Sequence, residues 1–220
     1  MRALLGIISG LIISDLLKNT VTSMQGDWPP KSPSVANGLV MLGATFFVTR
    51  VLADNLLYYT DRDAATGDSD DDAYTKRVFL IVCDLTSYAF CYAIVLRLVD
   101  TGTGRYLGMQ TLAWALFYFV VVEALHWWWC RVAIKIVTER KDRAERQRLN
   151  LLIRWRRLSR ESTALWAIPA AAAFAIPRQP QFVTVPVAAF ICALSVASAW
   201  RYLSKMRDQY LGLEFCDEDT

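Results

Sequence analysis

The chain has 220 residues, of which 55% are hydrophobic and only 20% are charged, and its mean hydropathy of +0.27 is high for a soluble domain. The apolar residues stand in long blocks, so the composition excludes a disordered chain and points to an integral membrane protein. The net charge of +3 indicates nothing about partners until the charges are located.

Six apolar segments are candidates for membrane-spanning helices. In chain order they are residues 3–17, 36–59, 78–99, 109–131, 163–177 and 182–203. A helix needs about 20 mostly apolar residues to cross a bilayer, and the first and fifth segments fall short of that length. The sequence therefore predicts an all-α fold, a polytopic integral membrane helical bundle of about six spans.

The first segment, residues 3–17, is interrupted by Asp15. It follows Arg2 and has about the length of a signal peptide, but no clear small-residue cleavage site comes after it. We therefore expect a span that stays in the chain, with Asp15 near its outer end beside Lys18. Cleavage is the alternative, and it would leave five spans without moving the others.

Three acidic residues fall at a similar depth in the next three spans. Asp54, Asp84 and Glu123 each lie about six residues, or about 9 Å, from the inner end of their span. Arg50 lies one turn before Asp54, and His126 lies three residues after Glu123. Ionisable groups inside a membrane are costly and need a partner or a purpose. The sequence thus predicts a buried polar cluster of these five residues.

Three roles are open for this cluster. Its side chains could pair as contacts that hold the spans together. They could also form a proton or cation pathway, or a switch in which the single histidine changes charge. A catalytic pair of carboxylates is the third interpretation, but the sequence offers no nucleophile or metal-ligand set to accompany it. We therefore expect no enzyme activity, no cofactor and no metal.

The end of the fourth span carries Trp127, Trp128 and Trp129 in succession. Aromatic residues gather at the level of the lipid headgroups, so we expect these three to be interface anchors. A stacking or ligand-binding role is the alternative.

Residues 138–162 form a strongly basic segment without Pro or Gly, so the fourth span is predicted to continue into the cytoplasm as one helix. The candidate docking residues are Arg140, Arg143, Arg146, Arg148, Arg154, Arg156, Arg157 and Arg160. They could rest on anionic lipid or dock a cytosolic protein. No nucleic-acid-binding motif accompanies the charge, so nucleic acid is not an expected partner.

Beyond the basic segment, residues 163–204 are expected to form a membrane hairpin. As a helix its first arm reaches only about 22 Å, so it either spans the membrane or re-enters it. Most of the 24 Lys and Arg residues then fall on one side, which places both termini in the cytoplasm of a multi-pass inner-membrane protein. An acidic loop at 61–74 is expected to be solvated, with a divalent-ion site as the alternative.

The predicted organisation is four spans in residues 1–137, a basic helix at 138–162, a hairpin at 163–204 and a cytoplasmic tail at 205–220. These features favour a non-enzymatic, homo-oligomeric membrane subunit. It would couple an event in the membrane or envelope to a cytosolic protein docked on the basic helix. The general layout is that of subunits in bacterial stress or defence systems. A proton or cation channel or transporter that uses the polar cluster is the alternative.

Overall fold

The computed structural model describes residues 7–15, 17–18, 32–62, 71–99, 107–138, 143–175 and 182–210. Its named helices are α2 (Ser32–Arg62), α3 (Asp71–Val99), α4 (Met109–Thr138), α5 (Arg143–Ala175) and α6 (Val185–Tyr210). Residues 7–15 and 17–18 are helical as well. An isolated bridge between Gly108 and Phe182 joins the starts of α4 and α6. Over the described residues the fold is thus all-helical, as predicted.

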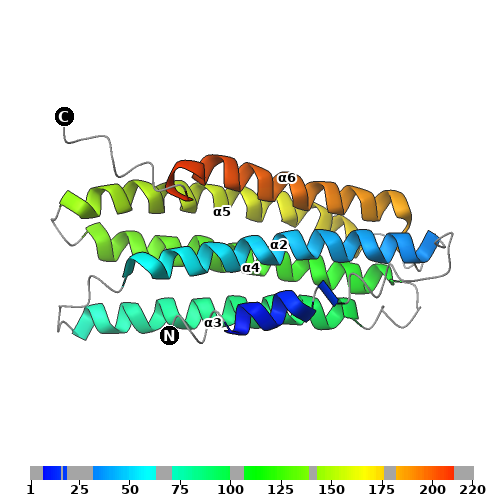
Figure 1. Ribbon diagram of the computed structural model, residues 1–220, viewed down its shortest axis with the longest axis horizontal. Coiled ribbons are helices and arrows are strands. Elements are labelled where there is room, and N and C mark those ends of the chain that lie inside the picture. Colours follow the sequence, from blue (N-terminus) through cyan, green and yellow to red (C-terminus); the bar gives the residue numbers. More distant parts are fainter. Residues whose placement is uncertain are drawn as a thin grey trace.

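The helices lie side by side along the long axis of the molecule, and successive helices from α2 to α6 alternate in direction (Figure 1). The closest neighbours are α4 with α5, α2 with α6, and α3 with α4. We use the term basic end for the end of the bundle where α4 stops and α5 starts, and far end for the opposite one. A residue's position along one helix therefore fixes which residues of the other helices share its level.

Four helices are long and apolar enough to cross a membrane. Their apolar stretches are Val35–Ala53, Val78–Leu98, Met109–Lys135 and Val185–Ser204. These stretches overlap the four longer segments predicted from the sequence, so that part of the prediction is confirmed. The two shorter predicted segments are helical where they are described, but neither is among these four.

The burial pattern of α3 shows why such a helix suits a membrane. Its buried face repeats every three or four residues and includes Leu80, Asp84, Ser87, Tyr88, Cys91 and Ile94. Its exposed face is equally apolar and includes Phe79, Val82, Leu85, Tyr92 and Leu96. In water such a face would be unfavourable, whereas in a bilayer it meets hydrocarbon.

The basic segment does not continue α4, which corrects the predicted extension of the fourth span as one helix. The helix α4 ends at Thr138, and α5 is a separate helix that runs back along it. Leu152 and Trp155 of α5 are buried in one apolar cluster with Trp129 of α4. Burying each such side chain contributes roughly 1.5–3 kcal/mol, which a helix projecting alone into solvent would forgo.

An aromatic stack fills the centre of the bundle, on the far-end side of the polar site. The rings of Phe47 in α2 and Phe119 in α4 are stacked with centroids 3.9 Å apart. Trp166 of α5, which is fully buried, meets both rings edge-on at 5.8 and 4.9 Å. This stack fixes α2, α4 and α5 at one level, and one turn along each helix brings three polar side chains together.

Candidate functional site

The centre of the site is an ion pair between Arg50 of α2 and Glu123 of α4. The two side chains are only 3% and 0% exposed. Ser162 of α5 donates a hydrogen bond of 2.8 Å to the same carboxylate oxygen, Glu123 Oε1. Among the described residues, Glu123 Oε2 has no hydrogen-bond partner. The Glu123 carboxylate therefore joins α2, α4 and α5 through Oε1 alone.

Aromatic rings surround the positive charge of this pair. The guanidinium carbon of Arg50 lies 4.7 Å from the ring centroid of Tyr202 in α6 and 5.3 Å from that of Phe47. Cation–π contacts of this kind stabilise a cation that has left water. The site thus draws on α2, α4, α5 and α6.

Two further predicted members of the polar cluster, His126 and Asp84, are buried near the level of this pair. His126 is buried one turn after Glu123, within electrostatic range of Arg50. Asp84 is buried on α3. It shares the level of Glu123, because α3 and α4 are in register where Phe79 lies against the ring of Trp128.

Asp54 lies on α2, but its side chain is outside the described residues. Ser162 and Tyr202 were not predicted as site residues. Their types are common in helices, and only the packing of α5 and α6 brings them to Arg50 and Glu123.

The three consecutive tryptophans do not share one surface. Trp128 is 56% exposed, whereas Trp129 is buried beneath α5. Trp127 is half-buried, and the guanidinium carbon of Arg131 lies 5.9 Å from its ring centroid. Successive residues on a helix point in different directions. Of the three tryptophans, only Trp128 is exposed enough to anchor the chain among lipid headgroups, and Trp129 is a core residue.

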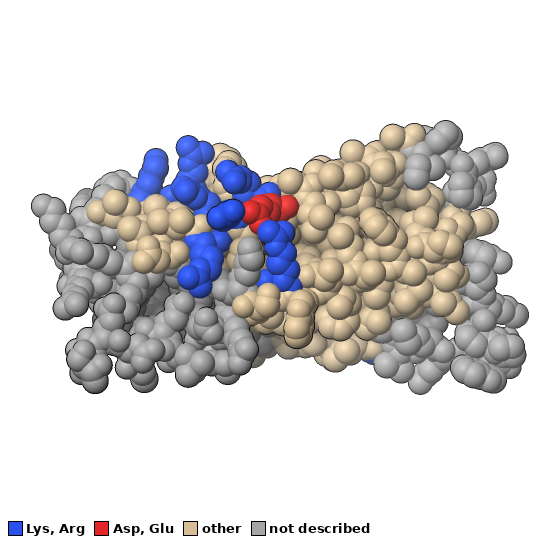
Figure 2. All heavy atoms as spheres, turned by 90° about the horizontal axis from the view of Figure 1, so that it is seen from above, with Lys and Arg blue, Asp and Glu red and all other residues tan. Residues whose placement is uncertain are grey.

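Positive charge gathers on one part of the surface formed by α5 and α6, toward the basic end, while the described surface beyond it toward the far end shows no charge (Figure 2). Arg154, Arg157 and Arg160 of α5 are exposed there, and Arg156 is half-buried. Of the remaining predicted docking residues, Arg140 and the side chains of Arg143, Arg146 and Arg148 lie outside the described residues.

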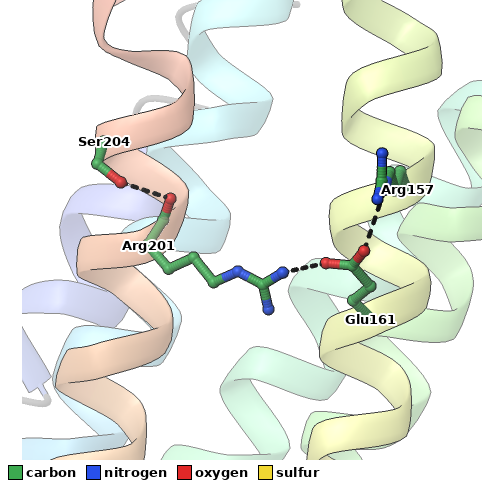
Figure 3. A network of polar contacts seen from close by, with 4 residues as sticks. All are labelled: Arg157, Glu161, Arg201 and Ser204. Atoms are coloured by element: carbon green, nitrogen blue, oxygen red, sulfur yellow. Dashed lines mark hydrogen bonds and ion pairs between the residues drawn. The ribbon is translucent and has the colours of Figure 1, made fainter.

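Glu161 lies at the boundary between the charged and uncharged surfaces. Its carboxylate accepts a hydrogen bond of 3.1 Å from Arg157 Nε, one turn away on α5, and pairs with Arg201 from α6 (Figure 3). These pairs lie on the surface, where 73% of the Arg157 side chain and 49% of the Arg201 side chain are exposed. We call Arg157, Arg160, Glu161 and Arg201 the arginine rim.

The described part of the chain contains no candidate metal site. Within it, no group of three or more His, Cys, Asp or Glu side chains could hold a metal ion. Cys83, Cys91, Cys130 and Cys192 are buried and form no disulfide among the described residues. Residues 63–70 of the acidic loop lie outside the described residues.

Four long apolar helices around a buried ion pair define the class, that of a multi-pass helical membrane protein. Comparison of the chain with models of protein families, with curated proteins and with solved structures gave no match.

Proposed function

We propose that the protein is a non-enzymatic, oligomeric membrane subunit that docks an acidic cytosolic protein on the first half of α5. The observation that carries this proposal is the division of α5 into two sides. Its apolar residues Leu152, Trp155 and Leu158 are buried in the bundle, whereas Arg154 is exposed on the opposite side. Arg143, Arg146 and Arg148 belong to the same stretch of helix.

The proposed topology has six spans, with the basic end and both termini in the cytoplasm of a cell with an inner membrane. The excess of Lys and Arg in the loops at the basic end supports this orientation. The second half of α5 supports a fifth span, because Trp166 and Ala170 lie in the same core as the four apolar helices. Only 33% of the α6 span is buried, which leaves a surface for a second copy.

Coupling would run through α5 itself. Ser162 binds the buried carboxylate of Glu123, and it follows the exposed arginines on the same helix. A shift of α5 on docking would therefore change the hydrogen bond at Glu123, and through it the contact between α4 and α2. This route gives the buried ion pair a role in the proposed subunit.

The test is affinity purification in mild detergent at low salt, with mass determination of every retained protein. We expect a stoichiometric soluble partner, and at least a tenfold loss of it in the double variant Arg148→Glu/Arg154→Glu. The matched control is Arg131→Glu/Lys135→Glu, which reverses two exposed charges of α4 and should keep the partner. Recovery of the protein alone, or equal loss in both variants, would overturn the proposal.

A second candidate, proton or cation conduction, is favoured by one observation. Glu123 is fully buried, and its Oε2 has no hydrogen-bond partner in the described part of the chain, so one oxygen of a buried carboxylate is open to a passing ion. Conduction predicts flux in liposomes that Glu123→Gln and Asp84→Asn abolish while the protein stays folded. Flux unchanged in both variants would exclude it.

A further inference from the structure

We propose that the arginine rim binds the phosphate of an anionic phospholipid, whose acyl chains lie over the apolar surface of α5 and α6. Arg157 lies at the end of the protein-docking stretch, whereas Arg160, Glu161 and Arg201 lie beyond it, and lipid binding at the rim does not require a docked protein. The rim contains three arginines and one glutamate, so it keeps a positive charge after its internal ion pairs are formed.

The depth of the rim is the first argument. Measured from Val185, where the apolar span of α6 begins, Arg201 lies about 24 Å along the helix, and a hydrocarbon core is about 30 Å thick. By the same measure Trp128 lies about 28 Å from Met109 on α4. Glu161 of the rim is next to Ser162, which binds Glu123 on α4, and Glu123 lies five residues, or about 7.5 Å, before Trp128. The rim therefore lies closer to the hydrocarbon than the aromatic boundary on α4.

Exposed guanidinium groups at this depth are costly unless an anion meets them. Arginine side chains can extend toward the headgroups, and the anion available there is the lipid phosphate, which arginine binds through paired hydrogen bonds. Trp200, next to Arg201, is 73% exposed, and tryptophan is enriched at the headgroup level. Charge and aromatic exposure thus indicate the same depth.

The surface on the far-end side of the rim suits acyl chains. Ile168 and Phe174 of α5 are 73% and 50% exposed, and Phe190 of α6 is 60% exposed. This surface carries no charge among the described residues (Figure 2). A diacyl lipid with its phosphate at the rim would cover apolar side chains of both helices, which free phosphate would not do.

The rim is also held in place before any ligand binds. Glu161 pairs with Arg157 along α5 and with Arg201 across to α6 (Figure 3). The carboxylate orients both guanidinium groups, but it also competes with a phosphate for them. Removing its charge should therefore strengthen lipid binding, whereas removing the arginines should weaken it.

The experiment measures lipid retained by the full-length protein in mild detergent, by native mass spectrometry, after equilibration with equal amounts of phosphatidylglycerol and phosphatidylcholine. We expect the wild type to retain phosphatidylglycerol at least fivefold over phosphatidylcholine. Arg160→Gln/Arg201→Gln should remove that preference, and Arg131→Gln/Lys135→Gln should keep it. Equal retention of the two lipids by the wild type would overturn the proposal, as would a preference that survives the loss of Arg160 and Arg201.

Glu161→Gln distinguishes a specific effect on lipid binding from misfolding, because the variant is expected to bind more lipid, which a misfolded protein would not do. It should raise retention of phosphatidylglycerol by about twofold or more and leave phosphatidylcholine unchanged. A fall or no change would contradict the proposed competition. Inorganic phosphate at the same concentration should not displace the lipid, and displacement would show a phosphate site in place of a lipid site. If Arg160→Gln/Arg201→Gln lost a co-purifying soluble protein but kept its preference for phosphatidylglycerol, the arginine rim would be a protein-binding surface instead of a lipid site.

Discussion

A Glu123→Leu variant is expected to lose about 3–5 kcal/mol of unfolding free energy, because it leaves the charge of Arg50 buried without its carboxylate. Arg50→Leu should have a loss of similar size. The double variant Arg50→Leu/Glu123→Leu should recover most of it, since an apolar pair of similar volume replaces a buried ion pair at little cost. Tryptophan fluorescence during denaturation in mild detergent measures all three variants, and the difference between single and double variants gives the coupling energy.

The chain provides its own matched control for this experiment. Glu161 and Arg201 form the same chemical pair on the surface, where their side chains are 27% and 49% exposed. Exposed pairs contribute about 0–1 kcal/mol, so the unfolding free energy of Glu161→Gln should lie within about 1 kcal/mol of the wild-type value. If the double variant at Arg50 and Glu123 is as unstable as either single variant, the two side chains are not coupled as the structure indicates.

The double variant also separates stability from function. A folded protein with leucine at both positions lacks the carboxylate that Ser162 of α5 binds. If Glu123 couples docking on α5 to the contact between α4 and α2, this variant should still bind the soluble partner but should lose the cellular response that partner binding triggers. If the pair only holds the helices together, binding and response should both survive.

The apolar spans were predictable because a membrane requires long uninterrupted stretches of apolar residues, and such stretches are visible in one dimension. Arg50 and Glu123 were found for the same reason, since a charge within such a stretch demands a partner. The reversal between α4 and α5 was not visible, because no Pro or Gly marks it. It follows from the burial of Leu152 and Trp155 against α4, which is a tertiary effect.

The partners of the site were hidden for a related reason. Ser162 contributes a hydroxyl and Tyr202 contributes a ring, and neither residue type is unusual where it stands. The pairing of Glu161 with Arg201 joins residues far apart in the chain, so the sequence showed basic residues without the acid that orients them. Sequence patterns indicate which groups need partners, and helix packing determines which partners they get.

Gly43→Leu is expected to lower the unfolding free energy by about 3 kcal/mol, because α2 and α6 approach each other closely at this glycine. A Cβ atom at Gly43 would lie 3.1 Å from the Cα of Cys192 and 3.1 Å from Ser195 Oγ. The Cys192 atom belongs to the backbone, and the Ser195 hydroxyl is held by a hydrogen bond of 2.9 Å to the carbonyl of Ile191. Neither neighbour can move easily, so the larger side chain forces the helices apart.

Gly43→Ala makes the prediction sharper, because two effects oppose each other there. Alanine favours a helix by about 1 kcal/mol over glycine, whereas overpacking costs about 1–3 kcal/mol. We expect the clash to win and the variant to be less stable. Gly10 is the control, since a Cβ there would meet nothing within 4 Å, and Gly10→Ala should be neutral or stabilising. Equal gains for both alanine variants in the same detergent denaturation assay would mean that α2 and α6 are not closely packed at Gly43.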